Sequence, residues 1–297
     1  MENDIASRIL YMRQDCLVLN KLPGEAVEGA GEGMGDLPRL LGKALAAKDG
    51  AAADALALPQ AVHRLDVPVS GCVVFARTRS ALQFLNAVFN GGGAFSSTAP
   101  AEKSAVEKQY WAIVEAGPQA AAFAASGELV HWIQFDSRNN KSAAYTEPGP
   151  GRKKAVLRYR LAGAGKNYLF MEIELVTGRH HQIRAQLARM GLHIKGDLKY
   201  GARRSEPHGG IRLHARSLSF PGPLDNGGRV TVQAEPPLQD NLWLAFREAV
   251  RSCQQTVPVE PNACAAAAAK NSAAAHPIFS RFSAPTKNES TDPECAP

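Results

Sequence analysis

The sequence has few cysteines, and they form no pattern. Five cysteines are scattered along the chain without a Cys-x-x-Cys pair, namely Cys16, Cys72, Cys253, Cys264 and Cys295. An odd, dispersed set of this kind indicates neither a disulfide framework nor a cysteine zinc site. We therefore expect reduced thiols and an intracellular, cytoplasmic protein.

Long apolar runs are also missing. None approaches the roughly 20 residues that a membrane-spanning helix needs. The opening MENDIASRIL lacks the basic-then-apolar order of a secretion signal. With 297 residues, of which 45% are hydrophobic, the chain can instead fill a sizeable core. We expect a soluble monomer with no membrane partner.

Nucleotide-binding loops and metal-ligand patterns are absent as well. Neither Gly-x-x-x-x-Gly-Lys-Ser/Thr nor Gly-x-Gly-x-x-Gly occurs. His180 and His181 are adjacent, so on a helix their side chains would point in different directions. His193, His208 and His214 stand in no ligand pattern with acids. We predict that the protein uses no cofactor and no metal.

Positive charge is in excess, with a net charge of +6 and a pI of about 9.1. A basic chain suits a polyanionic partner, because each cation that meets a phosphate releases condensed counterions. Five of the ten residues in 151–160 are basic, and a looser group comprises Lys195, Lys199, Arg203, Arg204, Arg212 and Arg216. The alternative for both groups is an ordinary solvated strand face and loop.

Strand patterns dominate the chain. Short apolar runs at 16–19 and 72–76 predict buried strands, and further strands are predicted at 109–116, 128–135, 155–161, 168–176, 211–220 and 229–234. Helices are predicted near 37–47, over 80–90 behind Ser80 as N-cap, and after Thr177 as cap with a stop at Gly191. Several strands, few helices and no regular βαβ alternation predict an α+β fold around a mixed sheet.

Composition also suggests boundaries along the chain. Residues 1–253 read as one folded domain, in which 25–57 and 91–107 are variable insert or loop regions. Residues 254–297 are of low complexity, with little to bury, and predict a disordered tail. We assign no function to that tail.

Asp66 stands in an unusual context. Most aspartates are surface or capping residues, but residues 61–76 read AVHRLDVPVSGCVVFA. This stretch resembles the signature of the RluA-type RNA pseudouridine synthases, in which His-Arg-Leu-Asp is followed four residues later by Ser-Gly and an apolar strand. The catalytic aspartate of that family maps onto Asp66.

Further motifs follow in the order of that family. Residues 108–114, KQYWAIV, carry its active-site tyrosine onto Tyr110, and residues 177–184, TGRHHQIR, carry its ion-pairing arginine onto Arg184. GDLKYG at 196–201 and LHA at 213–215 complete the series. The resemblance implies a long mixed, mainly antiparallel sheet bent around a central cleft with flanking helices. It also implies isomerisation of specific uridines in structured RNA, either rRNA or tRNA.

Pseudouridine formation breaks the bond from ribose C1′ to uracil N1, turns the base and rejoins C1′ to C5. An ionised Asp66 can act as nucleophile at C1′ or as base toward the C2′ proton, and the sequence leaves both routes open. Arg184 would keep the carboxylate charged with a planar fork of donors. The alternative for Arg184 is a surface arginine that contacts phosphate.

The other expected site residues have alternatives of their own. Tyr110 can stack on the uracil and present its hydroxyl near C5, or it can be a half-buried core tyrosine. Extruding a base costs a few kcal/mol, and Arg64 would enter the vacated space or else pair with an acid. His63 is read as structural support with a minor RNA contact. The remaining expected RNA contacts are Lys108, Arg179, His181 and Lys195.

Two departures from the family pattern bear on substrate choice. Val67-Pro68-Val69 replaces a basic, an acidic and a threonine residue, and Gln186 stands where a histidine is common. One rival is an RNA-folding chaperone that retains the fold but has weakened catalysis. The other is a carboxylate-dependent hydrolase, which needs a second carboxylate or metal-binding acids that we do not find around Asp66 in the sequence.

Overall fold

The computed structural model describes residues 4–29, 36–49, 58–90, 106–117, 123–207, 209–223 and 228–255. The chain divides into two compact units, Met1–Pro258 and Val259–Pro297, and the described residues all belong to the first. Most of the predicted loop region 91–107, part of 25–57 and nearly all of the predicted tail lie outside the described residues. The domain boundary at 253 therefore stays a prediction.

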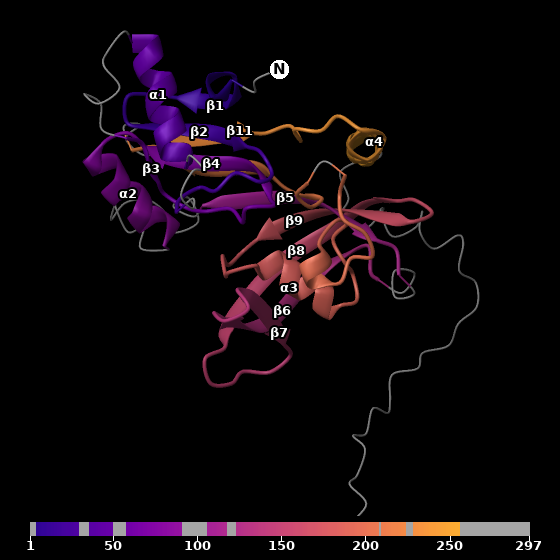
Figure 1. Ribbon diagram of the computed structural model, residues 1–297. Coiled ribbons are helices and arrows are strands. Elements are labelled where there is room, and N and C mark those ends of the chain that lie inside the picture. Colours follow the sequence, from indigo (N-terminus) through magenta and orange to yellow (C-terminus); the bar gives the residue numbers. More distant parts are fainter. Residues whose placement is uncertain are drawn as a thin grey trace, which may run out of the picture. The chain divides into compact units, whose positions relative to one another are not determined.

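One eleven-stranded sheet organises the described unit (Figure 1). Its strands are β1 Ile9–Met12, β2 Cys16–Lys21, β3 Gln60–Ala61, β4 Ser70–Ala76, β5 Glu107–Glu115, β6 Ser126–Asp136, β7 Lys141–Tyr145, β8 Lys153–Ala164, β9 Tyr168–Leu175, β10 Leu213–Pro221 and β11 Arg229–Gln233. The order is β1-β2-β4-β10-β5-β9-β8-β6-β7, with β11 beside β10 and β3 beside β4. Among the described strands β4 and β10 pair in parallel, and the other pairs are antiparallel. The predicted α+β fold with a mixed, mainly antiparallel sheet is confirmed.

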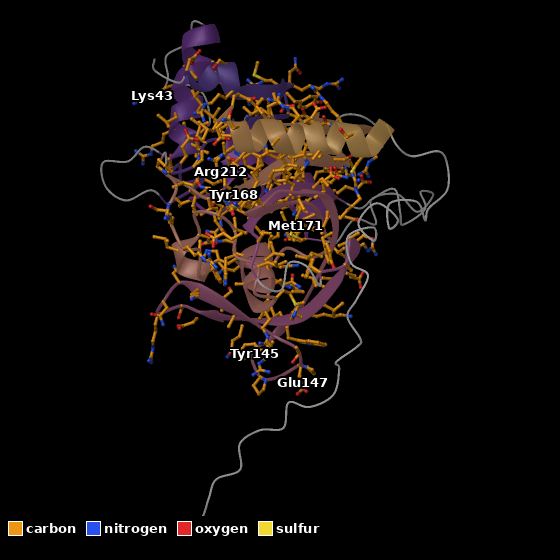
Figure 2. The ribbon with its side chains drawn as sticks, turned by 90° about the vertical axis from the view of Figure 1, so that its right-hand side faces the viewer. Lys43, Tyr145, Glu147, Tyr168, Met171 and Arg212 are labelled. Atoms are coloured by element: carbon orange, nitrogen blue, oxygen red, sulfur yellow. The ribbon has the colours of Figure 1, made fainter. Side chains whose placement is uncertain are left out.

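Strand β9 shows how alternation places the core. The strand predicted at 168–176 is present, its residues Met171 and Ile173 are buried on one face, and Met171 lies centrally in Figure 2. Phe170 on the opposite face is buried too, because helix α4, Asn241–Gln255, covers it with Trp243 and Phe246. This helix was not predicted, although its apolar residues recur at helical spacing.

The other helices are α1 Leu37–Asp49, α2 Arg79–Phe89 and α3 Gln182–Arg189, with short 3-10 turns η1 Ile5–Arg8 and η5 Leu198–Tyr200. The predicted N-cap of α2 is wrong. Thr78 caps the helix, because its hydroxyl accepts the Ala81 N–H at 3.2 Å, and Ser80 lies inside the first turn. A hydroxyl two residues earlier in the sequence satisfies the same unpaired donors.

The predicted cap of α3 is also wrong. The helix begins at Gln182, after His181 in a left-handed conformation (φ 51°) and without a side-chain cap. The Thr177 hydroxyl instead accepts the Val156 N–H at 2.8 Å and donates to Gln182 Oε1 at 2.8 Å, so it joins β8 to the start of α3. The predicted stop is confirmed, because Gly191 has a φ of 72° just beyond the last turn.

A glycine permits the parallel contact that lies next to the Asp66 loop. Gly71 on β4 has a φ of 116°, and a Cβ there would lie 2.3 Å from the carbonyl oxygen of Ala215 on β10. Its neighbour Ser70 contacts His214 Nδ1 at 2.8 Å, while His214 Nε2 contacts the Ala234 carbonyl at 2.9 Å. Since that carbonyl only accepts, the histidine proton lies on Nε2 and Ser70 donates to Nδ1. The Ser-Gly pair thus fixes β4 directly after Asp66.

Candidate active site

Asp66 lies in the loop between β3 and β4, and backbone hydrogen bonds hold this loop from three sides. Val69 N–H donates to the Asp66 carbonyl at 3.0 Å, Gly24 N–H to the Val67 carbonyl at 2.8 Å, and Ile211 N–H to the Pro68 carbonyl at 3.0 Å. The unusual Val67-Pro68-Val69 segment is therefore a fixed turn. Proline suits this position because the hydrogen bond from Ile211 uses the Pro68 carbonyl, and proline lacks only the N–H.

Lys21 supports the same loop from below. Its side chain is fully buried, and its ammonium donates to the carbonyls of Leu22 at 2.9 Å, Val67 at 3.0 Å and Val69 at 2.7 Å. Burial lowers the pKa of Lys21 to about 8, although the charges of Glu25 and Asp66 oppose that shift. The sequence places this lysine two residues after the predicted strand 16–19. A lysine that closely follows an apolar strand is the sequence feature that could have indicated its supporting role.

Arg184 on α3 joins two carboxylates. Its Nη1 donates to Asp66 Oδ2 at 3.0 Å, while Nε and Nη2 donate to Asp197 Oδ2 at 2.7 Å and Oδ1 at 2.9 Å. Arg184 is only 4% exposed, whereas the Asp66 side chain is 25% exposed. Burial alone would lower the pKa of Arg184, but the hydrogen bonds and charges of Asp197 and then Asp66 outweigh it and raise the pKa. The arginine is therefore a permanently charged, rigidly oriented partner of Asp66.

A second donor also faces Asp66. His181 Nε2 lies 3.5 Å from Asp66 Oδ2, the same oxygen that Arg184 contacts. Oδ1 receives no hydrogen bond from the residues that the structure describes. One carboxylate oxygen is thus held by the protein while the other remains available to a substrate.

Tyr200 determines which nitrogen of His181 carries the proton. The backbone N–H of Ser142 can only donate, so the Tyr200 hydroxyl oxygen accepts it at 2.8 Å, and the hydroxyl proton is left for His181 Nδ1 at 2.9 Å. Burial, and next the charge of Arg184, lower the pKa of His181 to about 3. The ring is then neutral, and the network assigns its single proton to Nε2, facing Asp66. The guanidinium carbon of Arg184 also lies over the Tyr200 ring, 4.8 Å from the centre of that ring.

Tyr110 lies on β5, opposite Ala215 of β10 and Ile173 of β9. It is buried, and burial followed by the negative charge of Asp66 raises its pKa. Its hydroxyl therefore stays protonated within the electric field of Asp66. Elements from four separate parts of the chain, the β3–β4 loop, β5, α3 and η5, converge on one carboxylate.

Comparison with known proteins decides the family. The sequence profile described as RNA pseudouridylate synthase matches residues 15–189, more than half of the chain. The chain belongs to this family. The resemblance to RluA-type enzymes is thereby confirmed, and the protein is an RNA pseudouridine synthase.

Named relatives and solved structures agree. Ribosomal large subunit pseudouridine synthase D of Zymomonas mobilis is 31% identical over 255 residues, which cover 82% of this synthase and 73% of the relative. The protein of the same name from Xylella fastidiosa is 32% identical over 240 residues, covering 74% and 63%. The structure of human RNA pseudouridylate synthase domain containing 4 has a TM-score of 0.61 at 19% identity, covers 83% of this chain and 94% of that one, and shows likeness of fold.

Two of the RNA contacts expected for the synthase, His63 and Lys108, are only partly exposed and contact Phe89. His63 Nε2 accepts the Val74 N–H at 3.2 Å and its ring stacks on Phe89 at 5.0 Å. Burial, and next the charge of Lys108, lower the pKa of His63 to about 3, which agrees with a supporting role. The Lys108 ammonium lies 5.0 Å over the same Phe89 ring. An RNA contact from either residue remains a prediction.

The other expected contacts differ in accessibility. Arg64 is exposed and forms no ion pair within the described ranges, so the alternative of an acid-paired arginine finds no partner there. Arg179 is exposed, and its Nε donates to the Lys154 carbonyl at 3.1 Å. Lys195 is paired with Glu206, and the Lys195 side chain is only 17% exposed. Arg64 and Arg179 are therefore better placed to meet RNA than Lys195.

Much of the predicted basic surface is engaged in ion pairs. Arg158 pairs with Glu128 and Glu174, and Arg212 pairs with Glu206 and Asp240. Further pairs are Arg160 with Glu172, Arg216 with Glu235 and Arg203 with Glu115. The number of basic residues in the two predicted groups thus overstates the positive charge that these groups offer to RNA.

Two sequence interpretations at α3 need correction. His180 and His181 precede the helix, and their rings stack 3.8 Å apart at 27°, so they do not diverge as expected of neighbours on a helix. Gln186 is fully buried, and its amide donates to the Leu129 carbonyl at 3.0 Å and to His131 Nδ1 at 3.2 Å. It joins α3 to β6 and cannot contact RNA, so this departure from the family pattern does not affect substrate choice directly.

Other kinds of site find little support in the described part of the chain. No cluster of three or more potential metal ligands occurs there, and no helix there is long and apolar enough to cross a membrane. A small cavity of about 200 Å³ lies between β1 and α1, lined by Ala6, Ile9, Leu10, Tyr11, Met12, Ala44 and Leu45. None of the expected site residues lines it, so a cleft at Asp66 remains a prediction.

Proposed function

We propose that Asp66 is the catalytic carboxylate and that the synthase isomerises a uridine of large-subunit ribosomal RNA. The observation that carries this proposal is the ion pair between Asp66 and the buried Arg184, at 3.0 Å. A guanidinium fixed in this way keeps a partly shielded carboxylate ionised, as either catalytic route requires.

The proposed chemistry begins at the carboxylate oxygen that the protein leaves unbonded. Asp66 Oδ2 accepts from Arg184 and faces His181, so Oδ1 would meet the ribose. As nucleophile it would bond to C1′ while the C1′–N1 electrons go to uracil. As C1′ bonds to C5, the bond from C1′ to Asp66 would break. As base, Asp66 would take the C2′ proton while the C1′–N1 bond breaks, and it would return that proton to C2′ when C1′ bonds to C5. In both routes the freed carboxylate can then take the C5 proton, and N1 gains a proton in its place.

Tyr110 and Arg64 would act on the uracil base and its position in the RNA, and not on the ribose. Tyr110 remains protonated beside Asp66, so it can stack on uracil and hold the position near C5. The exposed Arg64, two residues before Asp66, is suited to the space that an extruded base leaves. Contacts from Arg179 and His181 would orient the neighbouring backbone.

Ribosomal RNA is the substrate class that the relatives favour. Two of the relatives described above carry the large-subunit name, and each covers more than two thirds of this chain. Transfer RNA is the alternative substrate. We propose that the synthase acts as a cytoplasmic monomer without cofactor or metal.

Asp197 brings the hydrolase rival back into consideration, because it is a second carboxylate on the far side of Arg184. Sequence reasoning found no such group. However, Asp197 is 2% exposed and both of its oxygens accept hydrogen bonds from Arg184. A carboxylate bound in this manner cannot serve as a second acid or base, so Asp197 supports Arg184 instead.

Transcriptome-wide pseudouridine mapping tests the proposal. Total RNA is compared from cells with the wild-type protein, without it, and with Asp66→Ala. We expect one or a few large-subunit rRNA sites to disappear in both deficient strains. If sites vanish only on deletion, Asp66 is not the catalytic carboxylate. If the sites that vanish lie only in tRNA, the substrate is tRNA and not rRNA. If no site vanishes, the RNA-folding chaperone is favoured.

A further inference from the structure

Strand β6 carries an aromatic side chain that its own pattern predicts to be buried. Leu129, His131 and Ile133 alternate along the strand and are buried against the core. Phe135 is the next residue on that face, yet it is 49% exposed. Phe135 is thus an exposed aromatic side chain on the core face of β6, and α3 lies beside β6 and β7 (Figure 1).

Phe135 is connected to the active site through two histidine rings. Its ring lies 4.2 Å from that of His180 at 56°, and His180 stacks on His181 at 3.8 Å and 27°. His181 in turn places Nε2 3.5 Å from Asp66 Oδ2. Ser142, the cross-strand partner of Phe135, fixes His180 through a contact of 3.0 Å to its Nδ1. The exposed ring is therefore held in place and stands close to the catalytic carboxylate.

Two exposed lysines lie at the β6–β7 turn, which follows Phe135. Lys199 donates to the Asn140 carbonyl at 2.8 Å in the β6–β7 turn, and the Lys141 ammonium lies 5.2 Å over the Tyr200 ring. The charge of Arg64 acts on His180 from the loop of Asp66. Asp136 is the acid nearest in sequence, and its carboxylate is engaged by Asn139 at 2.6 Å and by the Arg138 N–H at 3.0 Å. Lys141, Lys199 and Arg64 thus add positive charge to this region, which also holds the carboxylates of Asp66 and Asp136.

We propose that Phe135, backed by His180, is a stacking platform for an unpaired base adjacent to the extruded uridine. A single exposed hydrophobic side chain is ordinary. A rigidly backed aromatic ring near a carboxylate site, with two lysines at the adjacent β6–β7 turn, has the features of single-stranded RNA recognition, in which bases stack on aromatic faces and cations meet the phosphates. Lys141 and Lys199 would contact the phosphates on either side of that base. The inference rests on the proposed function and adds a substrate contact to it.

Binding measurements test the platform separately from catalysis. Fluorescence anisotropy would follow a labelled single-stranded oligouridylate of about ten nucleotides, in the Asp66→Ala background, so that turnover does not intervene. Phe135→Ala should weaken affinity about five- to twentyfold, the effect of losing one stacked base. Phe135→Trp should restore binding, and an oligomer of abasic riboses should bind wild type and Phe135→Ala equally. Thermal melting checks that each variant folds.

Val130→Ala is the matched control, because Val130 is an exposed apolar residue of the same strand, 38% exposed, on the opposite face. It should leave affinity unchanged. Any of three outcomes would overturn the platform. Phe135→Ala could bind as tightly as wild type, it could lose no more affinity than Val130→Ala, or it could weaken binding of the abasic oligomer as much as that of oligouridylate. If Phe135→Ala weakens binding while the wild type shows no turnover on any RNA, the proposed function fails and the platform stands.

Discussion

Replacing Arg184 with lysine separates charge from geometry at the proposed site. The guanidinium makes three hydrogen bonds to two carboxylates, two to Asp197 and one to Asp66. A lysine has a single nitrogen, so it keeps the positive charge but cannot reach both acids in the same geometry. Since Asp197 is the more deeply buried acid, we expect the lysine to pair with Asp197 and leave Asp66 without its donor.

The expected loss follows from those bonds. A hydrogen bond to a charged group contributes about 1.5–3 kcal/mol. If the Asp66 bond contributes about 3 kcal/mol to the transition state, turnover falls about a hundredfold, at roughly 1.4 kcal/mol per tenfold change in rate. Stability should fall by about 1–3 kcal/mol, because the buried charge remains paired with Asp197. The catalytic loss should therefore exceed what partial unfolding explains.

Tritium release from C5 of labelled uridine in RNA measures turnover, and urea unfolding measures stability. Arg189→Lys is the matched control, since Arg189 is an exposed arginine on the same helix. It should change neither quantity. Wild-type turnover by a folded Arg184→Lys enzyme would refute the reasoning, because the fork geometry would then be irrelevant to Asp66.

Three further substitutions test other parts of the site. Tyr110→Phe should slow release of the C5 proton about tenfold or more while RNA binding is unchanged; equal losses of both would make the tyrosine structural. Tyr200→Phe leaves the Ser142 N–H and His181 Nδ1 without a partner. The substitution should lower the free energy of unfolding in urea by about 1–3 kcal/mol. It should also reduce kcat while KM changes less. An unchanged kcat would show that the hydrogen bond from Tyr200 to His181 does not influence Asp66. Gly71→Ala should cost about 2–4 kcal/mol in urea unfolding, because its Cβ would meet the Ala215 backbone at 2.3 Å. Gly29→Ala, with positive φ but open space, should cost much less, and equal costs would contradict the close-contact argument.

Local pattern accounts for what could be predicted. Alternating apolar residues placed β9, and the Gly191 stop ended α3 as expected, because strand pleat and helix termination depend on adjacent residues. The family motifs correctly joined Asp66 to Arg184 across more than a hundred residues. Resemblance supplied that pairing, since no local rule connects a loop aspartate to a distant helix.

Competing local signals account for the errors. Two hydroxyls, Thr78 and Ser80, stood near the start of α2, and only the backbone conformation of Thr78 made it the cap. Helix α4 was not predicted, and its identity as a helix is clear only from the packing of Trp243 and Phe246 against Phe170 of the sheet. His181 adopts a left-handed conformation that a non-glycine residue rarely takes, so no sequence rule predicted where α3 begins.

The sequence by itself determined the chemistry available to this protein, namely an aspartate in a recognisable loop, a tyrosine on a strand and an arginine on a helix. Only the tertiary structure decided what surrounds the carboxylate. Lys21 under the loop, Asp197 behind Arg184 and Tyr200 against His181 come from distant segments that the sheet brings together. Hydrogen bonds act over about 3 Å, whereas sequence patterns describe neighbours along the chain, so the immediate surroundings of an active site emerge only when the chain has folded.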